Sequence, residues 1–241
     1  MSVVIPAKDE AGNLPGLVTE IGAALAGRPF EVLVVDDGST DETGRVLAEM
    51  AAASAPWLRH IRHAQSCGQS ASIRTGVRYA RGRVIVTIDG DGQNDPRFIP
   101  QMLSAMEAEG GDVTMVAGER QGRKASWGKR YGSRAANGLR RTLLNDGTRD
   151  TGCGLKAIRR EIFLELPYFD GWHRYLPALV KREGGSVRYV DVVDRERVFG
   201  ASHYGLWDRA AVGILDLFGV WWLMRRRRRI QSPKEMHSDG Q

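Results

Sequence analysis

The stretch Asp89-Gly90-Asp91-Gly92-Gln93 places three oxygen-bearing side chains close together at the end of an apolar run. If the backbone stays extended, alternation puts Asp89, Asp91 and Gln93 on the same side. Two carboxylates and an amide suit a hard divalent cation that keeps some waters and bridges to phosphates. Asp and Gly are also the usual turn residues, so an acidic turn fits these letters equally well. The motif alone leaves both interpretations open.

Around this motif, strands are predicted to alternate with helices. Apolar β-branched runs predict strands over Val3–Ile5, Glu31–Val35, Leu58–Arg62, Val84–Ile88 and Val113–Ala117. Helices are predicted to begin near Asn13, Asp41, Gly68 and Asp95, with Asn13 and Asp41 as capping residues. This order indicates βαβ units and a mostly parallel α/β sheet flanked by helices.

Acidic residues recur where the predicted strands end. Glu10 follows the first strand, Asp36 and Asp37 follow the second, and Asp89 and Asp91 follow the strand from Val84. Ligands of such sheets bind outside the carboxyl ends of the strands. Carboxylates at three strand ends therefore favour a binding site over an acidic turn.

The second half of the chain is less regular. Residues 127–144 are expected to be helical and rich in arginine, and Asp150–Lys156 to form a loop or short strand. A helix is expected from Arg159 and a strand over Val187–Val193. No internal repeat and no linker between independent domains is evident.

Charge and cysteine content restrict the classes of partner and compartment. The net charge of +6 is concentrated in Arg225–Arg229 and between Arg120 and Arg160, which suggests an anionic partner: a membrane surface, nucleic acid or a phosphorylated substrate. Cys67 and Cys153 fit neither a disulfide framework nor a zinc site. No signal peptide precedes Val3, so a cytosolic, reducing location is expected.

Several motifs together carry a family resemblance. They are Val4-Ile5-Pro6 with Glu10, Val34 to Asp41, Gly68 with Gly76, Asp89 to Pro96, Asp150 to Lys156, and Arg197 to Ser202. In this order and spacing the chain resembles family-2 glycosyltransferases with the GT-A fold. Within them it is similar to polyprenol-phosphate sugar transferases related to dolichol-phosphate mannose synthase, from Val3 to about Arg229.

The resemblance implies a nucleotide-sugar donor, GDP- or UDP-linked, held with Mg²⁺ or Mn²⁺. The implied metal ligands are Asp89, Asp91 and Gln93, because a metal stabilises the charge that develops on a diphosphate leaving group. The implied nucleotide-sugar-binding residues are Pro6, Lys8, Glu10, Val35, Asp37, Asp89 and Gly90. For Asp36, a turn or helix-capping role is as good an interpretation as nucleotide contact.

The resemblance implies polyprenyl phosphate as the acceptor. Its phosphate oxygen is anionic near neutral pH and needs no general base, only cations that position it. The implied acceptor-phosphate residues are Arg120, Arg130, Ser133, Arg134, Asn137, Arg197 and Ser202. Of these, Arg120, Arg130 and Arg197 join Asp91 as predicted catalytic residues, although any one arginine taken alone is better explained as a surface charge. Attack opposite the leaving group would invert the anomeric centre.

This chain departs from the family pattern in two places. Lys8 and Asp9 stand where the family often carries an aromatic residue and an asparagine, which puts the identity of the donor in question. His203 stands where a lysine often follows the serine, and it fits either a pH-dependent phosphate contact or a surface position near the membrane.

The C-terminal segment predicts contact with a membrane surface. Apolar residues run from Tyr204 to Met224, with Trp221-Trp222 just before Arg225–Arg229, as in an interfacial helix near anionic lipid headgroups. The alternative is a helix packed on the core with a basic, solubilising end. We therefore expect a catalytic domain over residues 1–203, an amphipathic basic segment over 204–229 and a disordered tail over 230–241. The protein would be cytoplasmic and peripheral on the inner face of the membrane.

Two other functions compete with this prediction. A family-2 transferase acting on a hydroxyl acceptor of a polysaccharide or glycolipid needs a general base, for which Asp150 is the obvious candidate. A basic nucleic-acid-binding module is disfavoured by the strand-end carboxylates and by the lack of aromatic residues among the central arginines. Nucleic acid is therefore not an expected partner.

Overall fold

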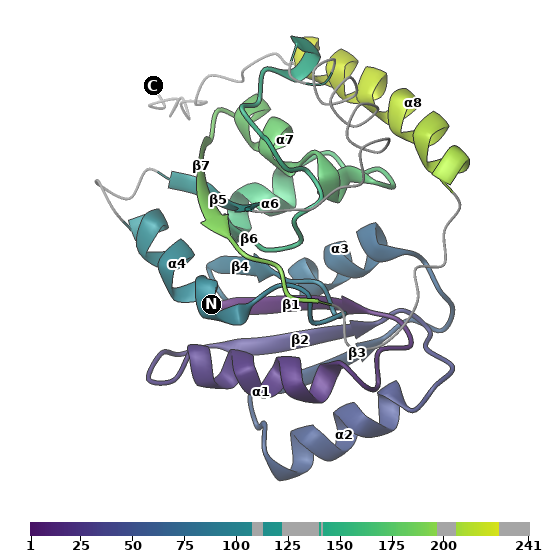
Figure 1. Ribbon diagram of the computed structural model, residues 1–241, viewed down its shortest axis with the longest axis vertical. Coiled ribbons are helices and arrows are strands. Elements are labelled where there is room, and N and C mark those ends of the chain that lie inside the picture. The colour runs from purple at the N-terminus through teal and green to yellow at the C-terminus, as the bar shows by residue number, and fades with distance from the viewer. Residues whose placement is uncertain (108–112, 122–139, 141, 197–205, 227–241) are drawn as a thin grey trace, which may run out of the picture.

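Figure 1 shows a computed structural model of the chain. It describes residues 1–107, 113–121, 140, 142–196 and 206–226, with side chains described from 213 onward in the last range. The predictions for Arg130, Ser133, Arg134, Asn137, Arg197, Ser202 and His203, and for the tail over 230–241, lie outside the described residues.

One seven-stranded mixed sheet forms the centre of the described part of the chain. Its order is β3-β2-β1-β4-β6-β5-β7. The strands are β1 Ser2–Ala7, β2 Glu31–Asp36, β3 Leu58–Arg62, β4 Val84–Thr87, β5 Val113–Arg120, β6 Lys156–Arg159 and β7 Ser186–Val192. The pairs β1–β2, β2–β3, β1–β4 and β5–β7 are parallel, whereas β6 is antiparallel to both β4 and β5. The predicted α/β fold with a mostly parallel sheet is confirmed.

The position of β6 could not be expected from the order of the strands along the chain. Its residues enter the sheet between β4 and β5, so that Lys156 pairs with Thr87 on one side and Ala117 on the other. Since β6 runs opposite to both neighbours, its first residue lies at the edge where β4 and β5 end. The loop that precedes Lys156 is thereby brought to the same edge as Asp89.

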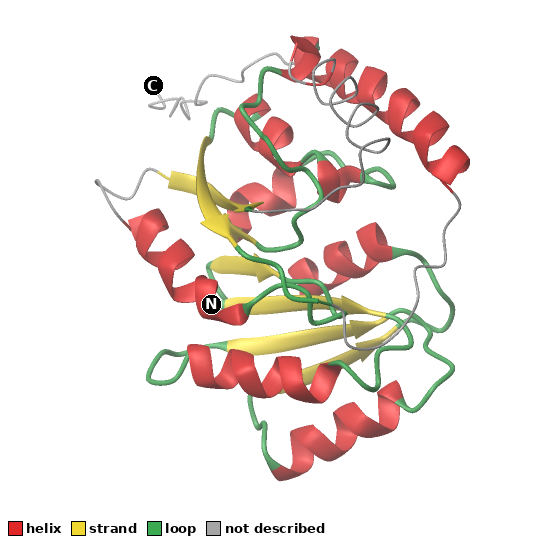
Figure 2. Cartoon of the chain, in the orientation of Figure 1, coloured by secondary structure: helices red, strands yellow, loops and turns green. Residues whose placement is uncertain are grey.

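Helices cover both faces of this sheet (Figure 2). The α-helices are α1 Leu14–Ala24, α2 Thr43–Ala53, α3 Gln69–Tyr79, α4 Ile99–Glu107, α6 Arg160–Glu165, α7 Leu176–Arg182 and α8 Leu206–Arg225, and two 3-10 helices are η1 Pro96–Phe98 and η2 Trp172–Arg174. Alternate strand residues serve the two faces: Val3 and Ile5 pack with α1, α2 and α4, and Val4 packs with α3 and α7. Strands buried on both faces explain the continuous apolar runs.

Local expectations were met unevenly. The N-cap residue of α2 is Glu42 and not the predicted Asp41, although Asp41 Oδ1 accepts a hydrogen bond from Thr43 N (3.0 Å) just before the helix. Asn13 is the N-cap residue of α1, as predicted, although its side chain makes no capping hydrogen bond and its amide donates to Glu10 Oε2 (2.6 Å) instead. Helix α7 was not predicted, since Leu176–Arg182 is too short for a clear helical period.

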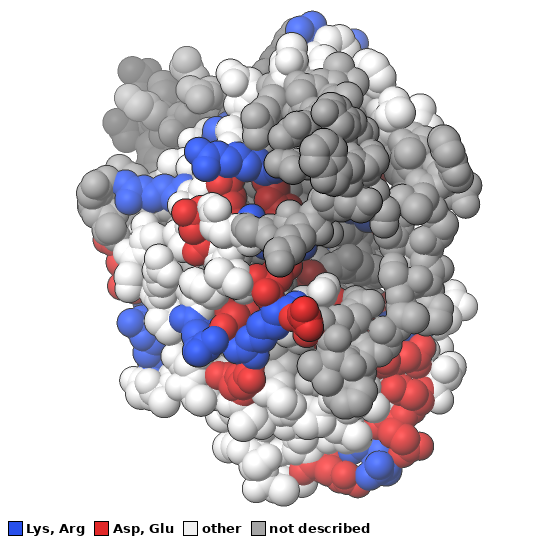
Figure 3. All heavy atoms as spheres, viewed as in Figure 1, with Lys and Arg blue, Asp and Glu red and all other residues white. Residues whose placement is uncertain are grey.

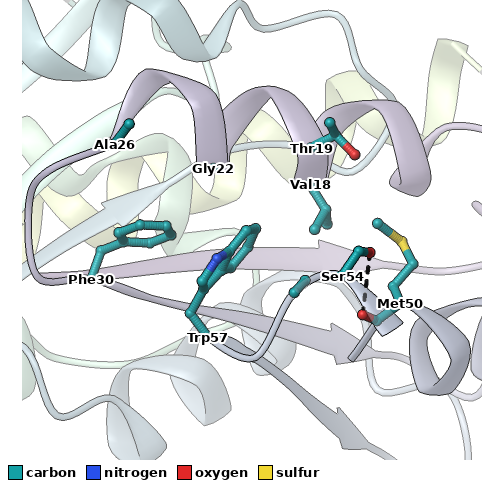
Figure 4. Close-up of a pocket in the computed structure, with 9 residues that line it drawn as sticks. Val18, Thr19, Gly22, Ala26, Phe30, Met50, Ser54 and Trp57 are labelled. Atoms are coloured by element: carbon teal, nitrogen blue, oxygen red, sulfur yellow. Dashed lines mark hydrogen bonds between the residues drawn. The ribbon is translucent and has the colours of Figure 1, made fainter. Parts of the chain in front are cut away.

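A small apolar cavity lies between α1 and α2 (Figure 4). Its volume is about 330 Å³, and Trp57 lies so close to Gly22 that a β-carbon there would be 2.6 Å from the indole. Phe30 and Trp57, which precede β2 and β3, help to line it, so it lies toward the amino ends of these strands. It is therefore remote from the edge that carries Asp89.

Helix α8 packs on α7 with one side and exposes apolar residues on the other. Leu217 and Val220 are buried, whereas the exposed large residues are Ile214, Leu215, Phe218 and Trp222. Arg225 stacks on Trp221 with 4.2 Å from its guanidinium carbon to the ring centroid. Across the described parts of the chain, no helix combines the length and apolarity that crossing a bilayer requires.

Candidate functional site

The chain turns directly after β4. Strand pairing ends at Thr87, residues 90 and 91 form a turn, and Gly92 has φ +72°. The extended alternation expected for Asp89, Asp91 and Gln93 was therefore wrong. The turn is held by Asp91 Oδ1, which accepts from Gln93 N (3.1 Å), and by Gln93 O, which accepts from Arg195 N (2.8 Å).

Gly90 brings this turn against the end of β1. A β-carbon at Gly90 would lie 3.0 Å from Pro6 O, so a larger residue would push the turn away from the strand. Pro6 pairs in turn with Val35 of β2. The structure thus places Pro6, Val35, Gly90 and Asp89 at one edge of the sheet.

Asp89 is the centre of the charge cluster at this edge. Its Oδ1 accepts from Gln69 Nε2 (2.9 Å), and a β-carbon at Gly154 would collide with its carboxylate. Burial and the neighbouring charge of Asp91 raise the pKa of Asp89 to about 6, despite opposing effects of Lys156 and Arg120. A carboxylate that is destabilised by burial and by a second carboxylate gains from a cation between them. The donor set therefore fits a divalent metal ion.

The loops after β1 and β2 are joined by hydrogen bonds. Asp9 has φ +55°, and its Oδ1 accepts from Thr40 N (2.7 Å) while its backbone N donates to Ser39 Oγ (2.9 Å). Glu10 N donates to Thr43 Oγ1 (3.0 Å). Lys8 is exposed beside these contacts. Lys8 and Glu10 thus lie on a loop that is fixed in place, and their contact with a nucleotide stays a prediction.

Asp37 is buried and organises the loop between β3 and α3. Its carboxylate accepts from Cys67 N and Gly68 N (2.8 Å each), from Ser66 Oγ (2.7 Å) and from His63 Nδ1 (2.8 Å). These donors outweigh the effect of burial and lower the pKa of Asp37 to about 2. Its assignment to the nucleotide stays a prediction, while its structural task is evident. No residue pattern indicated that Asp37 also holds the loop leading to Gln69.

The cluster Asp37, His63 and Cys67 has the ligand types of a metal site, but its geometry indicates a structural role. His63 Nδ1 and Nε2 are engaged by Asp37 and by Thr75 Oγ1 (2.9 Å), and Asp37 accepts backbone N–H groups. These contacts already use the lone pairs that a metal would need.

Arg120 lies at the end of β5 between two carboxylates. It donates to Asp150 through Nε (2.5 Å) and Nη2 (2.8 Å), and to Asp194 through Nη1 (3.1 Å). These contacts raise the pKa of Arg120 and lower that of Asp150 against the effect of burial. Arg120 is therefore held close to Asp89, but its positive charge is offset by Asp150 and Asp194. Its assignment to the acceptor phosphate stays a prediction.

Lys156 is a buried cation behind the cluster. It is 4% exposed, and its Nζ donates to Cys153 O. Burial lowers the pKa of Lys156, and Cys153 and Asp89 oppose that effect. Lys156 belongs to a motif of the family resemblance but had no predicted role, and no role was predicted for Gln69. Their spacing in the sequence does not indicate a site, because Lys156 and Gln69 come close to Asp89 only when the chain folds.

On the face drawn in Figure 3, the charged side chains of the described residues do not form a continuous basic patch. Lys and Arg side chains there lie among Asp and Glu side chains. This mixture gives no support on that face to the nucleic-acid-binding alternative.

Residues 2–166 match the model of the family described as glycosyl transferase family 2. The protein belongs to this family. The predicted membership is thus confirmed.

Among curated relatives of this family-2 glycosyltransferase is a dodecaprenyl-phosphate galacturonate synthase of Rhizobium johnstonii. It is 34% identical over 234 residues, which cover 95% of this chain and 68% of the relative. An undecaprenyl-phosphate 4-deoxy-4-formamido-L-arabinose transferase of Enterobacter sp. is 34% identical over 206 residues, or 85% of this chain and 62% of the relative. The chain spans about two thirds of the length of these relatives, and the likeness is consistent with the predicted polyprenol-phosphate sugar transferase group.

Solved structures support the GT-A type of fold. Glucosyl-3-phosphoglycerate synthase of Mycobacterium tuberculosis, crystallised with Mn²⁺ and UDP, matches with a TM-score of 0.70 at 20% identity, over 92% of this chain and 78% of that one. Mannosyl-3-phosphoglycerate synthase of Rubrobacter xylanophilus matches with a TM-score of 0.71 at 19% identity, over 100% of this chain and 79% of that one. At this identity the likeness concerns the fold alone.

Proposed function

We propose that this family-2 glycosyltransferase moves a sugar from a GDP- or UDP-linked donor to polyprenyl phosphate, with inversion at the anomeric carbon. The cluster at the carboxyl ends of β1, β2 and β4 supports a donor site, because it joins the predicted nucleotide loops to a pair of carboxylates suited to a metal. The curated relatives named above act, by their names, on dodecaprenyl and undecaprenyl phosphates.

In this proposal Asp89, Asp91 and Gln93 hold Mg²⁺ or Mn²⁺. When bound, the ion would offset the charge of the departing nucleoside diphosphate. The residues of this chain supply the geometry of the site. Gln69 orients the Asp89 carboxylate by its 2.9 Å hydrogen bond, and Gly90 and Gly154 leave room for the turn and the carboxylate.

The state of Asp150 is the observation that favours a phosphate acceptor over a hydroxyl acceptor. A hydroxyl must lose its proton to a base, and a good base has a pKa near the working pH. Arg120 binds both oxygens of Asp150 and lowers its pKa, which makes Asp150 a poor base. A phosphate brings an oxygen that is already anionic, so it needs positioning and no proton transfer.

The alternative of a hydroxyl acceptor would require Asp150 to leave Arg120. In that case Asp150→Asn should abolish turnover with a sugar acceptor and leave the affinity for the nucleotide unchanged. With a phosphate acceptor, the same substitution should retain measurable turnover.

The exposed stripe of α8 supports a peripheral contact with anionic lipid. Leu215, Phe218 and Trp222 are 72%, 50% and 52% exposed, on the side opposite buried Leu217 and Val220. Arg225 and Arg226 lie over Trp221 and Trp222 at the end of the helix. Aromatic and basic groups at the end of an apolar stripe are typical of interfacial helices. This arrangement would bring the site to the lipid acceptor.

The direct test is incubation with Mg²⁺, decaprenyl or undecaprenyl phosphate, and a panel of GDP- and UDP-sugars. We expect a lipid-linked sugar from one donor, in the inverted anomeric configuration. No product from any donor with either lipid, while a soluble sugar acceptor is glycosylated, would replace the proposal by the hydroxyl-acceptor alternative.

A further inference from the structure

His173 lies in η2, which packs against the first turn of α3. Gly171 N donates to Ser70 Oγ (2.9 Å), and Trp172 Nε1 donates to Ser70 O (3.3 Å). His173 Nδ1 lies 2.8 Å from the same Ser70 Oγ. The residue before Ser70 is Gln69, which donates to Asp89. The turn that carries His173 is therefore fixed beside the candidate metal site.

The hydrogen bonds of Ser70 determine where the imidazole carries its proton. Ser70 is fully buried, and its oxygen already accepts from Gly171 N. Among the described residues, His173 Nδ1 is the acceptor available to the hydroxyl proton. Because buried hydroxyl groups are satisfied, Ser70 donates to Nδ1. The proton of a neutral His173 is therefore on Nε2.

His173 stays neutral, and its Nε2–H group has no partner among the described residues. Burial, then the charges of Lys156 and Arg174, lower the pKa of His173 to about 3. Its side chain is only partly buried, and within the described ranges the buried side-chain atom left without a partner is Arg140 Nε, not His173 Nε2. No hydrogen bond joins Nε2 to a residue that the structure describes. Within the described residues, Nε2–H is thus a donor that remains for a ligand.

The surroundings of this donor favour an anionic oxygen. The charges that act on the imidazole are those of Lys156 and Arg174, and Ser70 belongs to the amino-terminal turn of the eleven-residue helix α3, the positive end of the helix dipole. Negative charge lies nearby as well, on the carboxylates of Asp170 and Asp216 at Gly171. A neutral imidazole with a lowered pKa is a poor base. It can therefore donate a hydrogen bond to a phosphate oxygen without changing the protonation state of that oxygen.

The same turn is contacted by α8, the helix with the exposed apolar stripe. A β-carbon at Gly171 would lie 2.9 Å from Asp216 of α8, and Tyr175 Oη donates to Gly213 O (3.2 Å). A lipid that reaches the protein along α8 would therefore arrive at the turn carrying His173. The nucleotide, by contrast, is expected at the loops after β1 and β2.

We propose that His173 binds the acceptor, its Nε2–H donating to an oxygen of the polyprenyl phosphate, with Ser70 fixing the tautomer. This inference rests on the proposed function. It assigns a substrate contact outside the arginines predicted from the sequence, and it separates acceptor binding from donor binding.

The test compares His173→Phe, which removes the donor, with His173→Gln, which keeps an N–H near the position of Nε2. We expect His173→Phe to raise KM for undecaprenyl phosphate about ten- to a hundredfold, the loss typical of one hydrogen bond to a charged group. His173→Gln should recover part of that loss. The dissociation constant for the nucleotide should not change in either variant.

Ser70→Ala should raise the same KM less, because the proton can then move to Nδ1. Ser72→Ala is the matched control: it removes another fully buried hydroxyl from the same turn, one that bonds to Gly68 O (3.0 Å) and faces no predicted ligand. A rise in KM for the nucleotide-sugar alone would assign His173 to the donor instead. If KM for undecaprenyl phosphate rises equally in His173→Phe, His173→Gln and Ser72→Ala, and Tm falls in all three, His173 has a structural role only.

A second measurement does not depend on turnover. In ¹⁵N-labelled protein, the imidazole shifts should show the Nε2–H tautomer of His173, and addition of farnesyl phosphate in detergent should move the Nε2 resonance. If the wild type transfers no sugar to any polyprenyl phosphate, the proposed function fails. If the Nε2 resonance also stays unchanged with farnesyl phosphate, the assignment of His173 fails with it.

Discussion

Asp37 and Asp89 are both aspartates at the carboxyl edge of the sheet, and their surroundings differ in kind. Asp37 is surrounded by donors, two of them backbone N–H groups, and its pKa falls to about 2. Asp89 is half-buried beside Asp91, and desolvation and the Asp91 charge raise its pKa to about 6. The Asp37 carboxylate holds a loop in place, whereas the Asp89 carboxylate is repelled by that of Asp91, and a bound cation would reduce this repulsion. Residue type and position at a strand end therefore do not reveal which task an aspartate performs.

The largest effect should come from removing the carboxylates of the metal site. Asp91→Ala or Asp89→Asn should lower turnover by roughly a hundredfold or more, because the ion contributes several kcal/mol of charge stabilisation. Steady-state assays with saturating Mg²⁺ measure the loss. Turnover within about twofold of the wild type would show that these residues hold no metal needed for the reaction.

Asp37→Asn should instead act on stability. Leaving buried donors without their carboxylate costs about 1–3 kcal/mol, so Tm should fall by several degrees. The pKa of Asp37 is lowered when the chain folds, so its contribution is present above pH 4 and is lost as pH falls toward 2. In the Asn variant, the free energy of unfolding should not show the part of the decrease between pH 4 and pH 2 that comes from Asp37. Unchanged Tm with weakened nucleotide binding would make Asp37 a nucleotide ligand instead of a loop organiser.

Affinity for the metal should depend on pH in the range set by Asp89. A proton on Asp89 competes with the ion, so the affinity for Mn²⁺ should be constant above pH 6 and fall up to tenfold per pH unit below it. Electron paramagnetic resonance of free Mn²⁺ measures the binding. Gln69→Ala should weaken binding by about tenfold through loss of the hydrogen bond that orients Asp89.

The smallest effects belong to α8. Arg225 and Arg226 should each contribute roughly 1 kcal/mol to binding of anionic vesicles, so replacing both by Gln should weaken binding about tenfold or more. Phe218→Glu should do the same by placing a charge in the exposed stripe. Flotation with phosphatidylglycerol vesicles measures both, and Arg45→Gln on exposed α2 is the control. Equal binding by all variants would leave α8 as a helix that covers the core.

Much of the fold could be predicted from the sequence, because the apolar runs and the residues between them indicated the same strands and helices. The runs at Val32 and Ile85 are continuous since both faces of the sheet are covered, and the strand after Trp57 was predicted with its bounds. The insertion of β6 between β4 and β5 carries no local signal, because it depends on which strands pair over a long distance. Lys156 reaches the site through that insertion, Asp194 through the pairing of β7 with β5, and Gln69 through the packing of α3.

The candidate site was predicted in its residue types and less well in its geometry. The acidic strand ends did mark the edge where the charges gather. The turn after Asp89 was not foreseen, because Gly92 adopts a conformation with φ +72° that favours glycine. The ion pairs of Arg120 with Asp150 and Asp194 were not foreseen either, since the partners come from distant loops.

Thermal unfolding of the wild type and of Asp89→Asn, each with and without Mn²⁺, tests the central claim most directly. Because the pKa of Asp89 is raised in the folded chain, its charge at pH 7 destabilises the metal-free protein, and Asp89→Asn should melt a few degrees higher. Mn²⁺ should raise the Tm of the wild type and leave that of the variant almost unchanged. A variant that melts lower than the wild type without metal and gains as much from Mn²⁺ would contradict the account.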